Sequence, residues 1–136
     1  MNETIPAANV MIIDDGELDT FIVKNTIKHV LSNINIKSCV NGLKALQTLR
    51  HLLITDPNHL PDYIFLDLSM PIMDGFQFLD EYNNLNIDAI RKIKIYVLSS
   101  SILTTDIKKA LENSFVSGFI SKPIDSKKLR EIFNVN

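Results

Sequence analysis

Four short apolar runs stand out along the chain, and in each of them the apolar character is nearly continuous. They lie at residues 10–13, 63–66, 95–98 and, more weakly, 118–120. Such runs are typical of strands that are covered on both faces, as in a parallel sheet. A fifth run, residues 34–40, alternates more between apolar and polar side chains, which predicts an edge strand.

Between these runs the apolar residues recur at helical spacing. The five stripes are Val23, Ile27, Val30 and Leu31; Ala45, Leu49, Leu52 and Leu53; Phe76, Leu79 and Tyr82; Ile107, Ala110 and Leu111; and Leu129, Ile132 and Phe133. The third helix has a start signal at Asp74, the fourth at Thr104 or Thr105, and the fifth at Asp125. Five alternating strands and helices predict an α/β fold, a doubly wound parallel sheet with helices on both faces.

Composition narrows the class of protein. The chain has 136 residues, 46% of them hydrophobic and 22% charged, and a net charge of −2. This predicts one folded domain and argues against a strongly basic nucleic-acid binder. The single cysteine, Cys39, excludes an internal disulfide and a multi-cysteine zinc site. No run is long enough for a membrane helix and no signal peptide is visible, so we expect a soluble, cytoplasmic protein without membrane contacts.

The strongest polar residues fall where the predicted strands end. Asp14 and Asp15 follow the first strand, Asp67 ends the third, Ser99 ends the fourth, and Lys122 follows the fifth. In an open parallel sheet these ends share one edge, where ligands bind. We therefore expect residues that are more than 100 positions apart to meet in one pocket.

That pocket has a definite chemistry. Three crowded carboxylates repel one another, and a hard cation such as Mg²⁺, which prefers oxygen ligands, relieves the repulsion. A lysine and a hydroxyl beside them suit a phosphoryl group, and a carboxylate can itself be the nucleophile that forms an acyl phosphate.

With these residues the chain resembles the receiver domain of two-component response regulators, of which the chemotaxis protein CheY is a member. The matching segments are residues 13–15, 65–75, 97–101 and 119–123. The segment around Asp67 is the most specific, because Pro71 and Gly75 follow at the family's spacing. The resemblance covers residues 8–135 and implies the flavodoxin-like strand order 2-1-3-4-5.

The resemblance also implies roles for individual residues. Asp67 is expected to accept the phosphoryl group and to be a ligand of Mg²⁺. Asp15 and the backbone carbonyl of Ser69 are expected to bind the same ion directly, and Asp14 is expected to bind it through water. Lys122 is expected to pair with the phosphoryl group.

Three further expectations concern the switch and the loop that carries the lysine. The hydroxyl of Ser99 should hydrogen-bond the phosphoryl oxygens. Phe119 stands at the family's switch position, where it could rotate inward with Ser99. The Lys122–Pro123 peptide is often cis in such domains.

The implied function is that of a phosphoacceptor signalling protein. A sensor histidine kinase or a histidine phosphotransfer protein would supply the phosphoryl group. Phosphorylation would then switch the surface of the fourth helix, fifth strand and fifth helix for an unidentified protein target. The chain would promote only its own phosphorylation and dephosphorylation, without nucleic acid, as a monomer or weak homodimer. We expect no output domain, and an excised piece of a larger regulator or hybrid kinase is the alternative.

Some features depart from the family or leave other functions open. Gly16 follows the acidic pair where a side chain is usual, and Ser69 and Ser101 flank the phosphoryl site. The run of serines at 99–101 resembles a subgroup that includes cyanobacterial phytochrome response regulators. A haloacid dehalogenase-type hydrolase would need a second acid at Ser69, and nucleotide-binding glycine motifs are missing from the sequence. A receiver that works by protein contacts alone would look the same outside the site.

Overall fold

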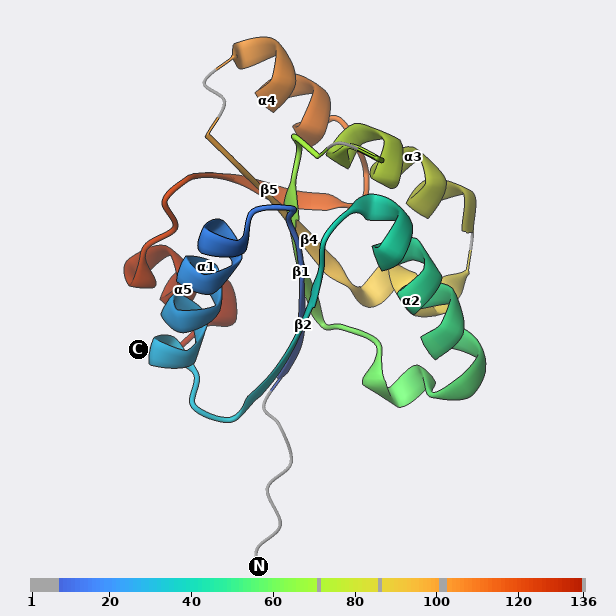
Figure 1. Cartoon of the computed structure of the whole chain (residues 1–136), viewed down its shortest axis with the longest axis horizontal. Helices are drawn as coiled ribbons and strands as arrows, with labels where there is room; N and C mark the ends of the chain where they lie inside the picture. Colours follow the sequence, from blue (N-terminus) through green and yellow to red (C-terminus); the bar gives the residue numbers. More distant parts are fainter. Residues whose placement is uncertain (1–7, 71, 86, 101–102, 136) are drawn as a thin grey trace, which may run out of the picture.

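Five parallel strands form one sheet in the order β2-β1-β3-β4-β5, as predicted (Figure 1). A computed structural model describes residues 8–70, 72–85, 87–100 and 103–135. The strands are β1 (Ala8–Ile13), β2 (Ile34–Cys39), β3 (Tyr63–Asp67), β4 (Lys94–Ser99) and β5 (Val116–Ser121). The helices are α1 (Glu17–Val30), α2 (Gly42–Thr55), α3 (Gly75–Leu85), α4 (Thr104–Leu111) and α5 (Ser126–Phe133). Short 3₁₀ helices at Pro57–His59 and Asp88–Lys92 complete the order.

Alternate residues of the central strand β1 supply the two faces of the sheet. Val10 and Ile12 face one hydrophobic cluster, and Met11 and Ile13 face the other. All four are almost fully buried, whereas β2 at the edge is largely half-buried or exposed. This confirms the prediction for the runs at residues 10–13, 63–66 and 95–98, which are central strands, and for the alternating run, which is an edge strand. The weaker run at residues 118–120 belongs to β5, which is the other edge strand and is mostly half-buried, so the expectation that this run is covered on both faces was wrong.

Helices cover both faces, so the two clusters form two separate cores. α1 and α5 pack on one face, and α2, α3 and α4 pack on the other (Figure 1). In the larger core, Tyr82 is completely buried and donates a hydrogen bond from its hydroxyl to the carbonyl of Ile90 at 2.8 Å. Within the described residues, none of the helices has the length and apolarity needed to cross a membrane.

Two of the three predicted helix starts are confirmed. The Asp125 side chain accepts a hydrogen bond from the Lys128 amide. Asp74 accepts one from the Gln77 amide at 2.9 Å, while the Gln77 side chain accepts one from the Asp74 amide at 3.0 Å. This reciprocal pair is a capping box.

The prediction for the fourth helix was wrong in two respects. Leu103 holds the cap position without a side-chain cap, so neither Thr104 nor Thr105 caps α4. These residues are exposed, and water can therefore satisfy the first amides of the helix. Leu111, which was expected in the apolar stripe, is 50% exposed, and Ala110 is the buried residue that α4 contributes to the core.

Candidate functional site

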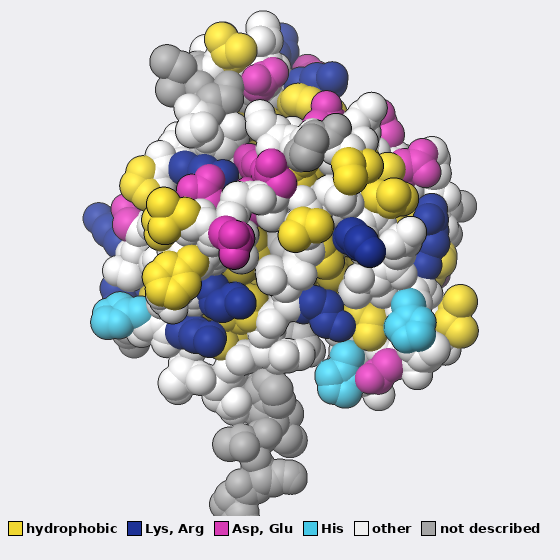
Figure 2. Space-filling view, in the orientation of Figure 1, with side chains coloured by type: hydrophobic (Ala, Val, Ile, Leu, Met, Phe, Trp, Pro, Cys, Tyr) yellow, Lys and Arg dark blue, Asp and Glu magenta, His cyan; other side chains and the backbone are white. Residues whose placement is uncertain are grey.

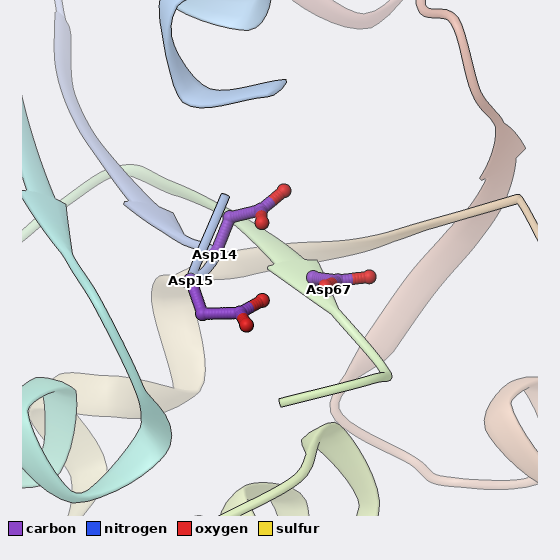
Figure 3. A group of neighbouring side chains, drawn as sticks. All are labelled: Asp14, Asp15 and Asp67. Atoms are coloured by element: carbon purple, nitrogen blue, oxygen red, sulfur yellow. The ribbon is translucent and has the colours of Figure 1, made fainter. Parts of the chain in front are cut away.

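Three carboxylates meet at the carboxyl edge of the sheet, as the sequence predicted. Asp14 and Asp15 directly follow β1, and Asp67 is the last residue of the neighbouring strand β3. One ligand oxygen from each of the three lies within 4.8 Å of the others. Figure 3 shows the three side chains gathered at these two strand ends. The close approach follows from the register, since Ile13 is paired with Leu66 and the next residue on each strand is an aspartate.

The three carboxylates differ in burial. Asp14 and Asp67 are only 5% and 7% exposed, whereas Asp15 is exposed. Burial raises the pKa of Asp67; the Lys122 charge opposes this rise and the Asp14 charge adds to it. A backbone hydrogen bond from Ser69 also lowers the pKa of Asp67, but the net shift is upward.

This set of donors fits a hard divalent cation. Three crowded carboxylate oxygens, two of them buried, leave an excess of negative charge that one ammonium does not balance. Mg²⁺ takes oxygen ligands of this kind and retains several waters, for which the exposed side of Asp15 leaves room. The side chain of Ser69 is exposed at the mouth of the site, two residues beyond Asp67.

Lys122 reaches the carboxylates from the loop after β5. Its ammonium donates hydrogen bonds to Asp14 at 3.0 Å and to Asp19 at 2.9 Å. It also lies 3.5 Å from Asp67 Oδ1. Burial lowers the pKa of Lys122, but the hydrogen bonds to Asp19 and Asp14 outweigh burial and raise it overall. The peptide between Lys122 and Pro123 is cis, as expected.

Sequence reasoning missed Asp19 as a member of the site. It lies in the first turn of α1, where acidic residues are common because they favour the helix dipole. Its contact with Lys122 joins positions 103 residues apart. Only the folded structure shows that this surface-like acid faces the lysine.

Ser99 lies on β4, which is paired with β3, and Phe119 lies on β5, which is paired with β4. Ser99 ends β4, is 3% exposed, and accepts a backbone hydrogen bond from the Lys122 amide at its carbonyl. Phe119 on β5 is half-buried against the larger core. Both lie where the sequence placed them. Pro71 and Ser101 fall outside the described residues.

Gly75 allows the turn after Asp67 to close. A Cβ atom at this position would lie 2.8 Å from the Asp67 carbonyl oxygen and 2.8 Å from Leu68 Cα. Backbone atoms cannot give way easily, so only glycine fits without a shift of the strand end. The role of the glycine in the matching segment is therefore steric.

Gly16 has a different environment. A Cβ there would make ordinary contacts, 3.4 Å from Asp14 Oδ1 and 3.6 Å from Asp19 Oδ2. The Gly16 amide donates to the Asp14 carboxylate at 2.9 Å, and the residue caps α1 without a side chain.

Apolar side chains on α1 lie beside the acidic edge. Leu18, Phe21 and Ile22 are 70%, 61% and 40% exposed. Figure 2 shows hydrophobic side chains over the side of the molecule where α1 runs, next to acidic ones at the end of the sheet. Away from the site, Cys39 is buried, and all three histidines are exposed.

Known proteins match nearly the whole chain. Residues 10–134 match the family model for the response regulator receiver domain. The chain is 27% identical over 123 residues to the sensor histidine kinase CheAY of Helicobacter pylori, a match that covers 90% of this chain and 14% of that protein.

Solved structures agree with the family match. A two-component response regulator from Cytophaga hutchinsonii superposes with a TM-score of 0.84 at 26% identity, over 93% of both chains. The phosphorylated cyanobacterial phytochrome response regulator RcpA superposes with a TM-score of 0.74 over 93% of this chain and 88% of its own. At 23% identity that likeness concerns the fold alone. The chain therefore belongs to the response regulator receiver domain family of two-component signalling, whose members bind Mg²⁺ at an acidic pocket and interact with histidine kinases or phosphotransfer proteins.

Proposed function

We propose that Asp67 accepts a phosphoryl group from a phosphohistidine on a partner protein, and that the resulting acyl phosphate switches the domain. The observation that carries this proposal is the meeting of three carboxylates within 4.8 Å, with the ammonium of Lys122 on two of them. We assign the whole activity to one receiver unit over residues 8–135. Its role is that of a signalling module rather than an enzyme with a separate substrate.

The transfer balances without a further reactant. A carboxylate oxygen of Asp67 attacks the phosphorus, and the bond from phosphorus to the donor's imidazole nitrogen breaks. That nitrogen keeps the electron pair, and because the other ring nitrogen carries a proton, the donor leaves as neutral histidine. Hydrolysis returns the domain to its first state: water attacks the phosphorus, and the products are the Asp67 carboxylate and inorganic phosphate.

The residues around Asp67 supply positioning and charge neutralisation, which account for most of the catalysis in phosphoryl transfer. Asp14, Asp15, Asp67 and the Ser69 carbonyl would hold Mg²⁺, which when bound supplies positive charge to the phosphoryl oxygens. Lys122 already stands 3.5 Å from Asp67 Oδ1 and would pair with the phosphoryl group.

The switch would begin at Ser99, the buried residue that ends β4. Its hydroxyl would donate a hydrogen bond to a phosphoryl oxygen and draw the loop after β4 toward Asp67. Phe119, half-buried on the adjacent strand β5, would follow inward. The surface made by α4, β5 and α5 would thereby alternate between two states for a protein target.

The phosphohistidine protein would approach over α1. The exposed apolar side chains of Leu18, Phe21 and Ile22 border the acidic edge and offer it a contact surface. Asp15 is the exposed member of the carboxylate group and leaves the site open on this side.

Intact mass spectrometry after incubation with Mg²⁺ and acetyl phosphate tests the proposal. The wild type should gain one phosphoryl group only when Mg²⁺ is present, and Asp67→Asn should gain none. Asp80→Asn, which removes an exposed carboxylate from α3, is the matched control and should behave as the wild type. A wild type that neither gains a phosphoryl group nor binds beryllofluoride would favour a receiver that signals by contacts alone.

A further inference from the structure

Three carboxylates surround the ammonium of Lys122. Asp14 and Asp19 accept hydrogen bonds at 3.0 and 2.9 Å, and Asp67 lies farther away, at 3.5 Å from its nearest oxygen. The lysine is largely buried, with its side chain 15% exposed. Its shortest contact is therefore with the one carboxylate that comes from α1.

Asp19 stands apart from the carboxylates that could hold a metal ion. In the part of the chain that the structure describes, the group that could hold a metal consists of Asp14, Asp15 and Asp67. The side chain of Asp19 is 50% exposed, at the rim of the site, and its Oδ2 atom accepts from the lysine. Apart from the general effect of its negative charge, Asp19 can therefore act on the phosphoryl group through its hydrogen bond with Lys122.

Asp19 and a phosphoryl group on Asp67 would both draw on the ammonium of Lys122. Once Asp14 is engaged by a cation and Asp67 is phosphorylated, Asp19 is the remaining partner that can hold the ammonium on the α1 side. Asp19, Lys122 and Pro123 also line a cavity of about 330 Å³ between α1 and the loop after β5, so the contact between Asp19 and the lysine borders open space.

We propose that Asp19 is a positioning residue that holds Lys122 toward α1 and so weakens its pairing with a phosphoryl group on Asp67. This inference rests on the proposed phosphoacceptor function and adds a residue to it. An ion pair with one half-exposed partner changes an equilibrium by about two- to fivefold. Removing the competing charge should strengthen phosphoryl binding by that factor.

Beryllofluoride, which mimics a phosphoryl group on a carboxylate, provides the test in the full chain at saturating Mg²⁺. Its dissociation constant can be followed by ¹⁹F NMR for the wild type and Asp19→Asn, and we expect about two- to fivefold tighter binding by the variant. Glu17→Gln removes a neighbouring charge of the same first turn and measures the general effect of lost negative charge. Asp19→Asn must exceed this control.

A double-mutant cycle separates positioning from a structural effect. In the Lys122→Ala background, Asp19→Asn should change beryllofluoride binding no more than Glu17→Gln does. Asp19→Ser serves as a second variant in case the asparagine disturbs the helix start, and it should shift binding in the same direction.

The outcomes are distinguishable. Equal or weaker binding by Asp19→Asn relative to Glu17→Gln, with normal binding by the wild type, would overturn the role of Asp19 and leave the phosphoacceptor proposal intact. A gain that persists without Lys122 would overturn it as well. Failure of the wild type itself to bind beryllofluoride would remove the phosphoacceptor proposal and this inference together.

Discussion

Replacing Asp67 by asparagine should stabilise the fold when no divalent cation is bound. The substitution keeps the size of the side chain and its ability to accept hydrogen bonds from Lys122 and Ser69. It removes one of two buried negative charges, since Asp14 and Asp67 are 5% and 7% exposed. The effect on stability depends on whether the attraction between the Asp67 charge and Lys122 exceeds the repulsion from the other carboxylates and the cost of burial.

The distances give the magnitude. At an effective dielectric constant of about 20, the Lys122 ammonium at 3.5 Å attracts the Asp67 charge by about 4.7 kcal/mol. The Asp14 oxygen within 4.8 Å repels it by at least about 3.5 kcal/mol. The attraction therefore exceeds the repulsion from Asp14 by only a small amount. The added repulsion from Asp15 and the free-energy cost of burying the Asp67 charge together exceed that amount, so the charge destabilises the fold. We expect Asp67→Asn to gain about 1–2 kcal/mol, or about 3–8 °C in Tm.

The sign of the pH dependence follows from the raised pKa of Asp67. Its ordinary value is 3.8, and burial moves it upward in the folded protein, so protonation of Asp67 favours the folded state. The advantage of Asp67→Asn over the wild type should therefore be full near neutral pH. It should shrink as the pH falls through the raised pKa toward 3.8, because the wild type then sheds the same charge.

Urea denaturation in the presence of EDTA measures this difference at neutral and at mildly acidic pH. Asp80→Asn removes an exposed carboxylate from α3 and should stay within about 0.5 kcal/mol of the wild type. An Asp67→Asn variant that is no more stable than the wild type at neutral pH, or whose advantage does not change with pH, would refute the reasoning.

Three other predictions concern the same structure. Gly75→Ala should cost about 1–3 kcal/mol in urea denaturation, because its Cβ would press on the Asp67 carbonyl at 2.8 Å; a neutral result would mean that the turn relaxes freely. Tyr82→Phe should cost about 1 kcal/mol in the same assay, because the Ile90 carbonyl loses the hydroxyl and keeps only the hydrogen bond from the Ile93 amide; an unchanged stability would show that the hydroxyl bond contributes nothing to the fold. Mg²⁺ at ten times its Kd should stabilise the wild type by about 1.4 kcal/mol in thermal melts, and equal stabilisation of Asp67→Asn would argue against this site.

The hydrophobic pattern predicted the fold because each central strand is an apolar run that can be recognised without its neighbours. Residues 63–66 are apolar throughout, and β3 is buried on both faces except at Tyr63, which is half-buried. The site followed from topology, since a polar residue at the end of each parallel strand must lie at the same edge. That argument placed Asp14, Asp67 and Lys122 together before any contact was known.

What the sequence did not predict depends on contacts between distant segments or on solvent. Asp19 has the character of an ordinary helix-start acid, and its contact with Lys122 arises from the packing of α1 beside the loop after β5. Thr104 belongs to a residue type that often caps helices, but Leu103 holds the cap position of α4. The cap of the second helix, by contrast, could have been predicted from the sequence. Asn41 directly precedes that helix, and its side chain accepts a hydrogen bond from the Lys44 amide.

The central claim is that Asp67 carries an acyl phosphate, and trapping that bond tests it most directly. Borohydride reduces an aspartyl phosphate to homoserine, so peptide mass spectrometry after reaction with acetyl phosphate and Mg²⁺ identifies the modified residue. The account predicts homoserine at position 67 in the wild type, dependent on Mg²⁺, with Asp14, Asp15 and Asp19 unchanged. Homoserine at another aspartate, or a phosphoryl group that resists borohydride because it is held by a histidine or a serine, would contradict it.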